Sequence, residues 1–575
     1  MNDSNSTLSF RAALVAMRQL EASGVKVVVA SPGLRNSPLL LAAHQTPGLK
    51  VITAVDERGG AFLALGICRA KREPTAILCT SGTAVANYFP AVLEANHSQL
   101  PLVVLTADRP TELVGTGANQ CTDQTKIFGS HVRFYAEVGP VAATASSLEQ
   151  AAYAVGRAVA KARGPSAGPV HLNLRFREPF LPEAGAFPDS SRPTGQPWAF
   201  FQAISAPTQE HAEAIRSLLE GAERPLILLG PAQLSKTDAK MLAQFSHRTR
   251  IPLLAEAASG IAFQGSDSSP YTIHRLETIL EQMLDGKLPA PDLILRFGEP
   301  VTGRALGRLL AKHPVPQLVF EEWGEAREPN LHPSIFLEGG LSLWIASLAQ
   351  METPQVNRAW PEGLLKADAD LESDITLHLD QEDTLTEWHF HRALAEKIGD
   401  SAAIFIGNSM PIRDFNSVFP RSPKNFSVFA NRGLSGIDGL LATAAGIAFT
   451  TKSETHAVVG DLSALHDINS LALLHSLREE INLTVWVMNN GGGEIFRIVP
   501  TAKTGENIEW FTTPQEFDLA GLAKGFRISY ARLYNQQDLA ELSGEAFSHR
   551  GVRLIEVLFD PETNLHVRKS FQDRK

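Results

Sequence analysis

The strongest constraint on the fold is a regular alternation of short apolar segments with longer segments of helical periodicity. In the first part of the chain, apolar residues recur at helical spacing over 37–45, 58–71 and 83–97. These stretches alternate with the strand-like segments VKVVVASPG, LKVITAVDE, PTAILCTSG and LPLVVLTAD, and the unit ends around GPVHLNLRF at 168–176. Strands that alternate with helices in this way are typical of a parallel, doubly wound sheet. The sequence therefore predicts an α/β fold.

The same alternation recurs twice further along the chain. A second set of strand-like segments consists of RPLILLG, IPLLAEAASG, APDLILRFGEP and VPQLVFEEW. A third set consists of AAIFIGNSM, FSVFANRG, THAVVGDLS, LTVWVMNN and VRLIEVLFD. A chain of 575 residues is too long for one hydrophobic core, and the stretch rich in Pro, Gly and Ser after the first set is typical of a linker. We therefore expect three tandem doubly wound parallel-sheet domains, at residues 1–185, 200–355 and 375–575.

Composition excludes several classes of protein. The net charge is -10 and no basic block is present, so we expect no nucleic-acid binding. No apolar run approaches the roughly 20 residues that span a bilayer, and the first residues lack the basic region of a signal peptide. The spacing of Cys68, Cys79 and Cys121 fits neither a disulfide framework nor a zinc site. These features predict a cytoplasmic protein without a membrane span.

Two polar motifs follow consecutive strands of the third set. Gly460-Asp461 ends one strand, and Asn490 lies 29 positions after Asp461 at the end of the next. Parallel strands joined by one crossover helix would bring the two residues side by side at the ligand-binding edge of the sheet. A carboxylate and an amide oxygen suit Mg²⁺, and the glycines after Asn490 give a diphosphate close access to the backbone. The alternative is that Asp461 is a helix N-cap and that Asn489-Asn490 is a turn.

This pair of motifs resembles the signature of the thiamine-diphosphate-dependent enzymes. The resemblance implies that Asp461, Asn490 and the backbone carbonyl of Gly492 hold Mg²⁺ or Mn²⁺, which binds the cofactor's diphosphate. It also implies that the cofactor lies against further residues of the same motifs, namely Gly460, Leu462, Ser463, Ser409 and Ile437, of which Ile437 supports the bent cofactor. Many members have glycine where this chain has Leu462.

The same resemblance implies a glutamate beside the pyrimidine ring of the cofactor. There the carboxyl group shares a proton with the ring and makes its amino group a base. Glu57, in the segment LKVITAVDERGG, is the candidate catalytic residue. The alternative is that Asp56 and Glu57 only place negative charge in the first turn of the next helix. Because the family binds the ring and the diphosphate with different subunits, the resemblance also implies a homodimer or homotetramer.

A narrower resemblance is carried by SPGLRNSPL, CTSGTAVANYFPAVLEA, LTADRPTEL, GANQCTDQ, GNSMPIRD and NRGLSGIDGLLATAAG. These segments resemble the thiamine-dependent transferases of menaquinone biosynthesis that decarboxylate 2-oxoglutarate and add the remaining four carbons to isochorismate. Both substrates are dicarboxylates, which arginine binds as a bidentate fork. The implied substrate residues are the arginines Arg35, Arg109, Arg304, Arg413 and Arg432, the polar residues Asn119, Gln120 and Ser409, and the apolar residues Ile495, Phe496 and Val499. The alternative is that the arginines are solvated surface residues and the apolar side chains ordinary core.

The chain departs from that family's pattern at a few positions. Leu34 stands where a serine is usual, and the segment Thr302-Gly303-Arg304-Ala305-Leu306 keeps one basic residue where a pair is usual. Glu494 is an acid where an uncharged residue is more common. The competing functions are another thiamine-dependent 2-oxo acid decarboxylase or carboligase, and a regulatory protein that kept the fold without the cofactor. A nucleotide-dependent dehydrogenase is not favoured, because SPGLRNSP lacks the G-x-G-x-x-G pattern.

Overall fold

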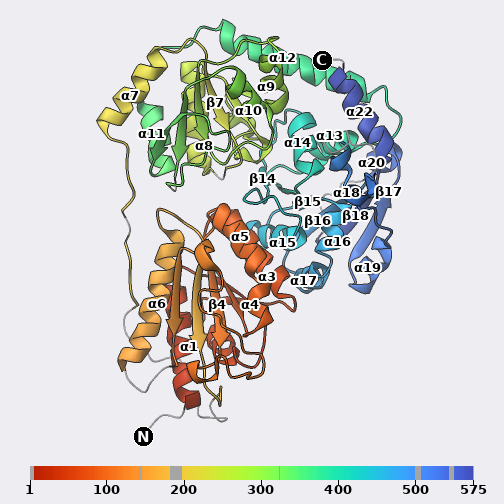
Figure 1. Ribbon diagram of the computed structural model, residues 1–575. Coiled ribbons are helices and arrows are strands. Elements are labelled where there is room, and N and C mark those ends of the chain that lie inside the picture. The colour runs from red at the N-terminus through yellow and green to blue at the C-terminus, as the bar shows by residue number, and fades with distance from the viewer. Residues whose placement is uncertain are drawn as a thin grey trace. The chain divides into compact units, whose positions relative to one another are not determined.

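The protein contains three six-stranded parallel sheets (Figure 1). The computed structural model describes residues 5–140, 145–181, 197–201, 203–232, 234–322, 324–498, 507–542 and 550–573. Every pairing between named strands in this part of the chain is parallel. The predicted α/β fold is therefore confirmed.

The first sheet has the strand order β2-β1-β3-β4-β6-β5. Its strands are β1 (Val27–Ala30), β2 (Lys50–Thr53), β3 (Thr75–Cys79), β4 (Leu102–Asp108), β5 (Phe134–Val138) and β6 (Val170–Arg175). The helices of this region are α1 (Asn5–Ala22), α2 (Ser37–His44), α3 (Glu57–Lys71), α4 (Thr83–Asn87), α5 (Phe89–His97) and α6 (Ala145–Arg163). The helix expected over 83–97 is divided at Tyr88, because Pro90 is tolerated in the first turn of a helix but not in its interior.

The second sheet has the order β12-β11-β10-β7-β8-β9. Its strands are β7 (Pro225–Leu229), β8 (Leu253–Ala255), β9 (Thr272–Ile273), β10 (Leu293–Phe297), β11 (Gln317–Glu321) and β12 (Ser334–Glu338). Its helices are α7 (Gln209–Glu220), α8 (Lys236–Thr249), α9 (Leu276–Leu284), α10 (Ala305–Lys312), α11 (Leu341–Gln350) and α12 (Ala359–Leu379). The first strand of this sheet along the chain, β7, lies at the centre beside the fourth, β10. This strand order is typical of doubly wound sheets.

The third sheet has the order β14-β13-β15-β16-β18-β17, which repeats the topology of the first. Its strands are β13 (Ala403–Ile406), β14 (Ser427–Phe429), β15 (Thr455–Gly460), β16 (Asn482–Asn489), β17 (Ser529–Leu533) and β18 (Gly551–Leu558). The helices are α13 (Glu387–Lys397), α14 (Met410–Val418), α15 (Leu440–Thr451), α16 (Asp461–His466), α17 (Ser470–Leu477), α18 (Glu509–Thr512), α19 (Leu519–Gly525), α20 (Gln536–Glu541) and α22 (Pro561–Asp573). The strand order changes direction between β13 and β15, where open sheets of this kind bind ligands.

The strands that the sequence did not predict all lie at sheet edges: β5, β9, β12 and β17. In β5, β12 and β17 only one of the five residues is buried, and β9 is two residues long. Central parallel strands are covered on both faces and are therefore continuously apolar, whereas edge strands keep polar residues. The apolar pattern consequently marks every central strand but only two of the six edge strands, β2 and β14.

The chain packs into two compact units. The first comprises Met1–Ala203, Gly433–Lys452 and His466–Ile481, and the second comprises Ile204–Arg432, Ser453–Leu465 and Asn482–Lys575. Helix α15 therefore belongs to the first unit, where it packs closely against α3. A Cβ atom at Gly66 of α3 would lie 2.1 Å from the carbonyl oxygen of Thr443, and one at Gly446 would lie 2.2 Å from that of Leu63. The boundaries 1–185, 200–355 and 375–575 follow the sheets and stay a prediction.

Candidate active site

Asp461 and Asn490 follow two neighbouring parallel strands. Strand β15 ends at Gly460, which lies opposite Met488 of β16, and β16 ends at Asn489. Asp461 and Asn490 therefore both leave the carboxyl edge of the third sheet, next to the point where its strand order changes direction. The predicted adjacency of these two strands is confirmed.

Asp461 is buried at the first residue of α16. Its Oδ1 accepts a hydrogen bond of 2.7 Å from the backbone N–H of Leu462. Burial raises the pKa of the Asp461 carboxyl to about 6, while hydrogen bonds from the backbone N–H groups of Leu462, Gly492 and Gly491 act in the opposite direction. A carboxylate that burial makes costly to ionise gains most from a cation beside it.

Asn490 presents an oxygen atom without a partner. Its Nδ2 donates a 2.7 Å hydrogen bond to Oε1 of Glu387, and its buried Oδ1 has no partner among the described residues. An unsatisfied buried amide oxygen is costly, and such atoms in native proteins call for an explanation. A hard cation bound by this oxygen and by Asp461 supplies one, so the residues present fit a magnesium site.

The three positions after Asn490 are glycines for different structural reasons. Gly491 has φ +85°, a backbone conformation that only glycine adopts readily, and no described atom would crowd a Cβ atom there. A Cβ atom on Gly492 would lie 2.5 Å from the carbonyl oxygen of Thr512, and the Gly493 N–H donates to that same oxygen at 2.7 Å. Gly492 and Gly493 therefore allow close packing on the end of α18, a reason that the sequence did not reveal.

The two asparagines of the motif are held by different buried carboxylates. Asn489 donates from Nδ2 to Oε1 of Glu556 at 2.6 Å, and Glu556 also accepts hydrogen bonds from Tyr530 and Arg532. Asn490 is held by Glu387, which pairs with Arg568. Glu387 at the start of α13 carried no recognisable sequence signal, so sequence reasoning missed it.

Glu494 now has a physical explanation. It begins the 3-10 helix η5 (Glu494–Arg497), and its Oε2 forms an ion pair of 2.6 Å with Nε of Arg497. Arg497 also pairs with Glu562 of α22 at 3.1 Å. The acid at this position therefore links the short helix to the end of the chain. Ile495 and Phe496 are half-buried in η5, whereas Val499 lies outside the described residues.

Three predicted substrate arginines lie close together in the second unit. Arg304 and Arg413 are exposed and Arg432 is half-buried. Desolvation of the guanidinium lowers the pKa of Arg413, and the positive charges of Arg432 and Arg304 lower it further. Nη1 of Arg413 donates to the carbonyl oxygen of Ser409 at 2.6 Å. Ser409 has φ +72° although it is not glycine, a strained conformation that is frequent at functional sites. The cluster of Arg304, Arg413 and Arg432 is suited to bind a carboxylate.

In the first unit, Glu57 begins α3 directly after the N-cap residue Asp56. The Asp56 carboxylate accepts hydrogen bonds from the backbone N–H groups of Arg58 and Gly59, so Asp56 performs the capping. Glu57 is half-buried, and its Oε2 accepts a hydrogen bond of 3.4 Å from Nδ2 of Asn87. The capping alternative therefore accounts for Asp56 and leaves Glu57 available for another role.

Arg35 and Arg109 are two buried arginines near each other in the first unit. Burial lowers the pKa of Arg35, and the positive charge of Arg109 lowers it further. Arg35 pairs with Glu178 at 3.2 Å and donates to the carbonyl oxygen of Phe176 at 2.7 Å. Nη1 of Arg109 is buried without a partner among the described residues. This arrangement leaves a buried guanidinium nitrogen of Arg109 available to a carboxylate.

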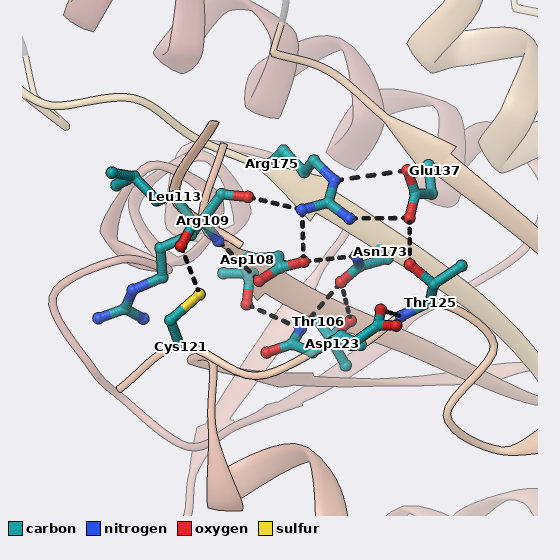
Figure 2. A network of polar contacts seen from close by, with 12 residues as sticks. Thr106, Asp108, Arg109, Leu113, Cys121, Asp123, Thr125, Glu137, Asn173 and Arg175 are labelled. Atoms are coloured by element: carbon teal, nitrogen blue, oxygen red, sulfur yellow. Dashed lines mark hydrogen bonds and ion pairs between the residues drawn. The ribbon is translucent and has the colours of Figure 1, made fainter. Parts of the chain in front are cut away.

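The backbone of Arg109 is fixed by a second buried arginine (Figure 2). Nη1 of Arg175 donates to the carbonyl oxygen of Arg109 at 2.8 Å and pairs with Oδ2 of Asp108 at 2.9 Å. The Arg109 N–H donates to Oδ1 of Asp108 at 2.7 Å, and Arg175 also pairs with Glu137 at 2.9 Å. Figure 2 shows the guanidinium of Arg109 pointing away from this cluster. Sequence reasoning missed Arg175, although it ends the apolar strand β6.

The loop that carries Asn119 and Gln120 is tied to the sheet. Both side chains are exposed, and Nε2 of Gln120 donates to the carbonyl oxygen of Ser81 at 2.9 Å. The buried Gln124, which sequence reasoning also missed, accepts from the Gly82 N–H at 3.1 Å and donates to Asn173 at 2.9 Å.

The remaining predicted residues divide between the units. Ile437 is half-buried in the first unit, next to α15. Gly460, Leu462 and Ser463 lie in the second unit, where Ser463 is buried. The described part of the chain contains no group of three or more His, Cys, Asp or Glu side chains arranged to hold a metal. A metal at Asp461 and Asn490 would therefore need amide, backbone and ligand oxygens to complete its coordination.

Two family models match the sheets that carry these residues. The description "Thiamine pyrophosphate enzyme, N-terminal TPP binding domain" matches residues 10–127, and "Thiamine pyrophosphate enzyme, C-terminal TPP binding domain" matches residues 414–557. The fold and the two matched regions define a thiamine diphosphate enzyme.

Similarity to curated proteins narrows that class. The chain is 35% identical over 559 residues to a protein of Chlorobaculum tepidum, a match that covers 95% of this chain and 93% of the relative. It is 36% identical over 563 residues to one of Chloroflexus aurantiacus (94% and 92%) and 33% identical over 555 residues to one of Geobacillus kaustophilus (96% and 95%). All three relatives carry the name 2-succinyl-5-enolpyruvyl-6-hydroxy-3-cyclohexene-1-carboxylate synthase. The chain belongs to the family of these synthases.

Proposed function

We propose that this protein decarboxylates 2-oxoglutarate with thiamine diphosphate and joins the remaining four-carbon unit to isochorismate. The product is 2-succinyl-5-enolpyruvyl-6-hydroxy-3-cyclohexene-1-carboxylate, an intermediate of menaquinone biosynthesis, and CO2 is released. The single observation that carries the proposal is the pair formed by buried Asp461 and Oδ1 of Asn490, which has no partner among the residues that the structure describes, at the ligand-binding edge of a matched cofactor domain.

Asp461, Asn490 and the carbonyl of Gly492 would hold Mg²⁺ or Mn²⁺ against the diphosphate. Gly460, Leu462 and Ser463 are contiguous with Asp461 along the chain and would line the same site. Thiamine diphosphate supplies the electron sink for decarboxylation and for carbon–carbon bond formation when it is bound. Glu57 would hold a proton beside the pyrimidine ring, and Ile437 would support the cofactor's bent shape.

Two groups of arginines support the proposal that both substrates are dicarboxylates. One group consists of Arg35 and Arg109 in the first unit, and the other consists of Arg304, Arg413 and Arg432 in the second. Each group lowers the pKa of one of its own members through like charge, so each gains stability from an added carboxylate. Ser409, Asn119 and Gln120 would complete the polar contacts, and Ile495, Phe496 and Val499 would contact the succinyl chain.

A thiamine-dependent decarboxylase or carboligase that acts on pyruvate is the second candidate. Such an enzyme binds only small monocarboxylates, which leaves no role for two separate groups of arginines, one of them buried. Leu34 precedes Arg35 and is 74% exposed. Leucine lacks the hydroxyl group of the serine that is usual at this position, but the guanidinium of Arg35 is still present. The two groups of arginines therefore favour dicarboxylate substrates over pyruvate.

Further properties belong to the same proposal. We propose a homodimer or homotetramer, because family members bind the two ends of the cofactor with different subunits. The cysteines Cys68, Cys79 and Cys121 are free thiols, which supports the proposed cytoplasmic location. No helix among the described residues has the length and apolar character needed to cross a membrane.

The test is the loss of isochorismate from a reaction that contains purified protein, Mg²⁺ and thiamine diphosphate. We expect isochorismate to disappear only when 2-oxoglutarate is also present. Pyruvate replaces 2-oxoglutarate in a parallel reaction. Consumption of pyruvate with isochorismate left intact would assign the protein to the second candidate function instead.

A further inference from the structure

The amide of Asn490 is oriented by one neighbour. An asparagine side chain can direct either its oxygen or its nitrogen to a given point, because the two ends have nearly the same shape. Here Nδ2 donates to Oε1 of Glu387 at 2.7 Å. Oε2 of Glu387 pairs with Arg568, which leaves Oε1 as the acceptor that faces Asn490. Glu387 therefore selects the nitrogen of Asn490 and directs Oδ1 to the opposite side. That oxygen is the buried atom without a partner among the described residues.

Glu387 is itself held firmly. Its Oε2 pairs with Nη2 of Arg568, and that nitrogen also pairs with Oδ2 of Asp414 at 2.6 Å. The backbone N–H of Glu387 donates to Oδ1 of Asn564 at 3.0 Å. All four of these residues are buried. A carboxylate fixed on both sides leaves its neighbour little freedom to rotate.

We propose that Glu387 is a positioning residue for metal binding, which keeps Oδ1 of Asn490 directed at the cation. This inference rests on the proposed function, because it takes Asn490 as a metal ligand. Partners that orient a metal ligand typically contribute about 10–100-fold to metal affinity.

A purely structural role for Glu387 makes a different prediction, and the chain offers a matched control. Glu556 is also buried, accepts a hydrogen bond of 2.6 Å from the adjacent Asn489, and also pairs with an arginine, Arg532. Asn489 is not a proposed ligand. If buried glutamates serve only to stabilise the sheet, Glu387→Gln and Glu556→Gln should affect the protein in the same way.

The experiment measures the affinity for thiamine diphosphate by calorimetry at several Mg²⁺ concentrations, together with thermal unfolding. We expect Glu387→Gln to weaken the Mg²⁺-dependent binding by about 10–100-fold, because a glutamine amide also donates and so permits either orientation of Asn490. Glu556→Gln should lower the unfolding temperature and leave that binding unchanged. Equal binding losses in the two variants, or wild-type binding in Glu387→Gln, would overturn the inference.

Two further measurements keep the result interpretable. If Glu387→Gln does not fold, Glu387→Asp retains the charge beside Arg568 but withdraws the carboxylate from Asn490, and we expect the same weakening. Wild-type protein that binds thiamine diphosphate equally well with and without Mg²⁺ would overturn the proposed metal site itself, before any variant is compared.

Discussion

Arg109 and Arg175 are two buried arginines of the first unit, yet replacing them should change stability in opposite directions. Arg175 pairs with Asp108 and Glu137 and donates to the backbone of Arg109. Arg109 has a buried Nη1 without a partner among the described residues, and it lowers the pKa of its neighbour Arg35 by charge repulsion. Arg109→Gln removes a buried donor that lacks a partner in the described part of the chain, whereas Arg175→Gln leaves the fully buried Asp108 without its counterion.

The magnitudes follow from these contacts. An unsatisfied buried donor costs about 1–3 kcal/mol, so Arg109→Gln should raise the free energy of unfolding by about 1 kcal/mol after some packing is lost. Breaking a buried ion pair by removing one partner costs about 3–5 kcal/mol, which is the loss expected for Arg175→Gln. A charge-assisted hydrogen bond to a carboxylate contributes about 1.5–3 kcal/mol, so Arg109→Gln should raise the KM of one dicarboxylate substrate by about 10–100-fold.

Urea unfolding and steady-state kinetics with each substrate test these values. The expected result for Arg109→Gln is a higher urea midpoint together with a raised KM for 2-oxoglutarate or isochorismate. A lower midpoint with both KM values unchanged would refute the reasoning, because Arg109 would then be an ordinary structural arginine.

Three other perturbations have defined outcomes. Glu57→Gln should retain thiamine diphosphate binding in calorimetry and lose about 10²–10⁴-fold in turnover, as expected for an acid–base group; full activity would exclude that role. Burial raises the pKa of Asp461 to about 6, so in the metal-free protein a proton occupies the carboxyl below that pH and competes with the cation. Mg²⁺-dependent cofactor binding should therefore weaken about tenfold per pH unit below pH 6, with proton release on binding, and a flat profile from pH 5 to 7 would contradict this. Gly66→Ala should lower the free energy of unfolding by about 1–3 kcal/mol in urea titrations, because its Cβ would lie 2.1 Å from the carbonyl oxygen of Thr443; unchanged stability would mean that α3 and α15 are not closely packed.

The sequence predicted the centre of each sheet and the residues at the strand ends. Continuous apolar runs identify buried parallel strands, and Asp461 and Asn490 follow two of them that are indeed neighbours. The edge strands β5, β12 and β17 escaped prediction because they are largely exposed and keep polar residues, and β9 because it is only two residues long. The packing of α15 with the first unit also escaped, because no local pattern shows which distant surface a helix covers.

The site was predictable only where a motif marks it. Arg35 and Arg109 lie in recognisable strand-end segments, and the structure brings them together. Glu387 and Arg175 act on motif residues from distant positions in the chain, 103 residues before Asn490 and 66 after Arg109. Such support depends on tertiary contacts, which neither spacing nor residue type reveals.

The proposed reaction can be followed through its carbon atoms. 2-Oxoglutarate labelled with ¹³C at every position is mixed with unlabelled isochorismate, Mg²⁺, thiamine diphosphate and the protein, and the products are analysed by mass spectrometry. We expect one labelled CO2 for each isochorismate consumed, and a product that carries the other four labelled carbons together with the intact enolpyruvyl group. Labelled CO2 with unchanged isochorismate, or no labelled CO2 at all, would rule out the proposed reaction.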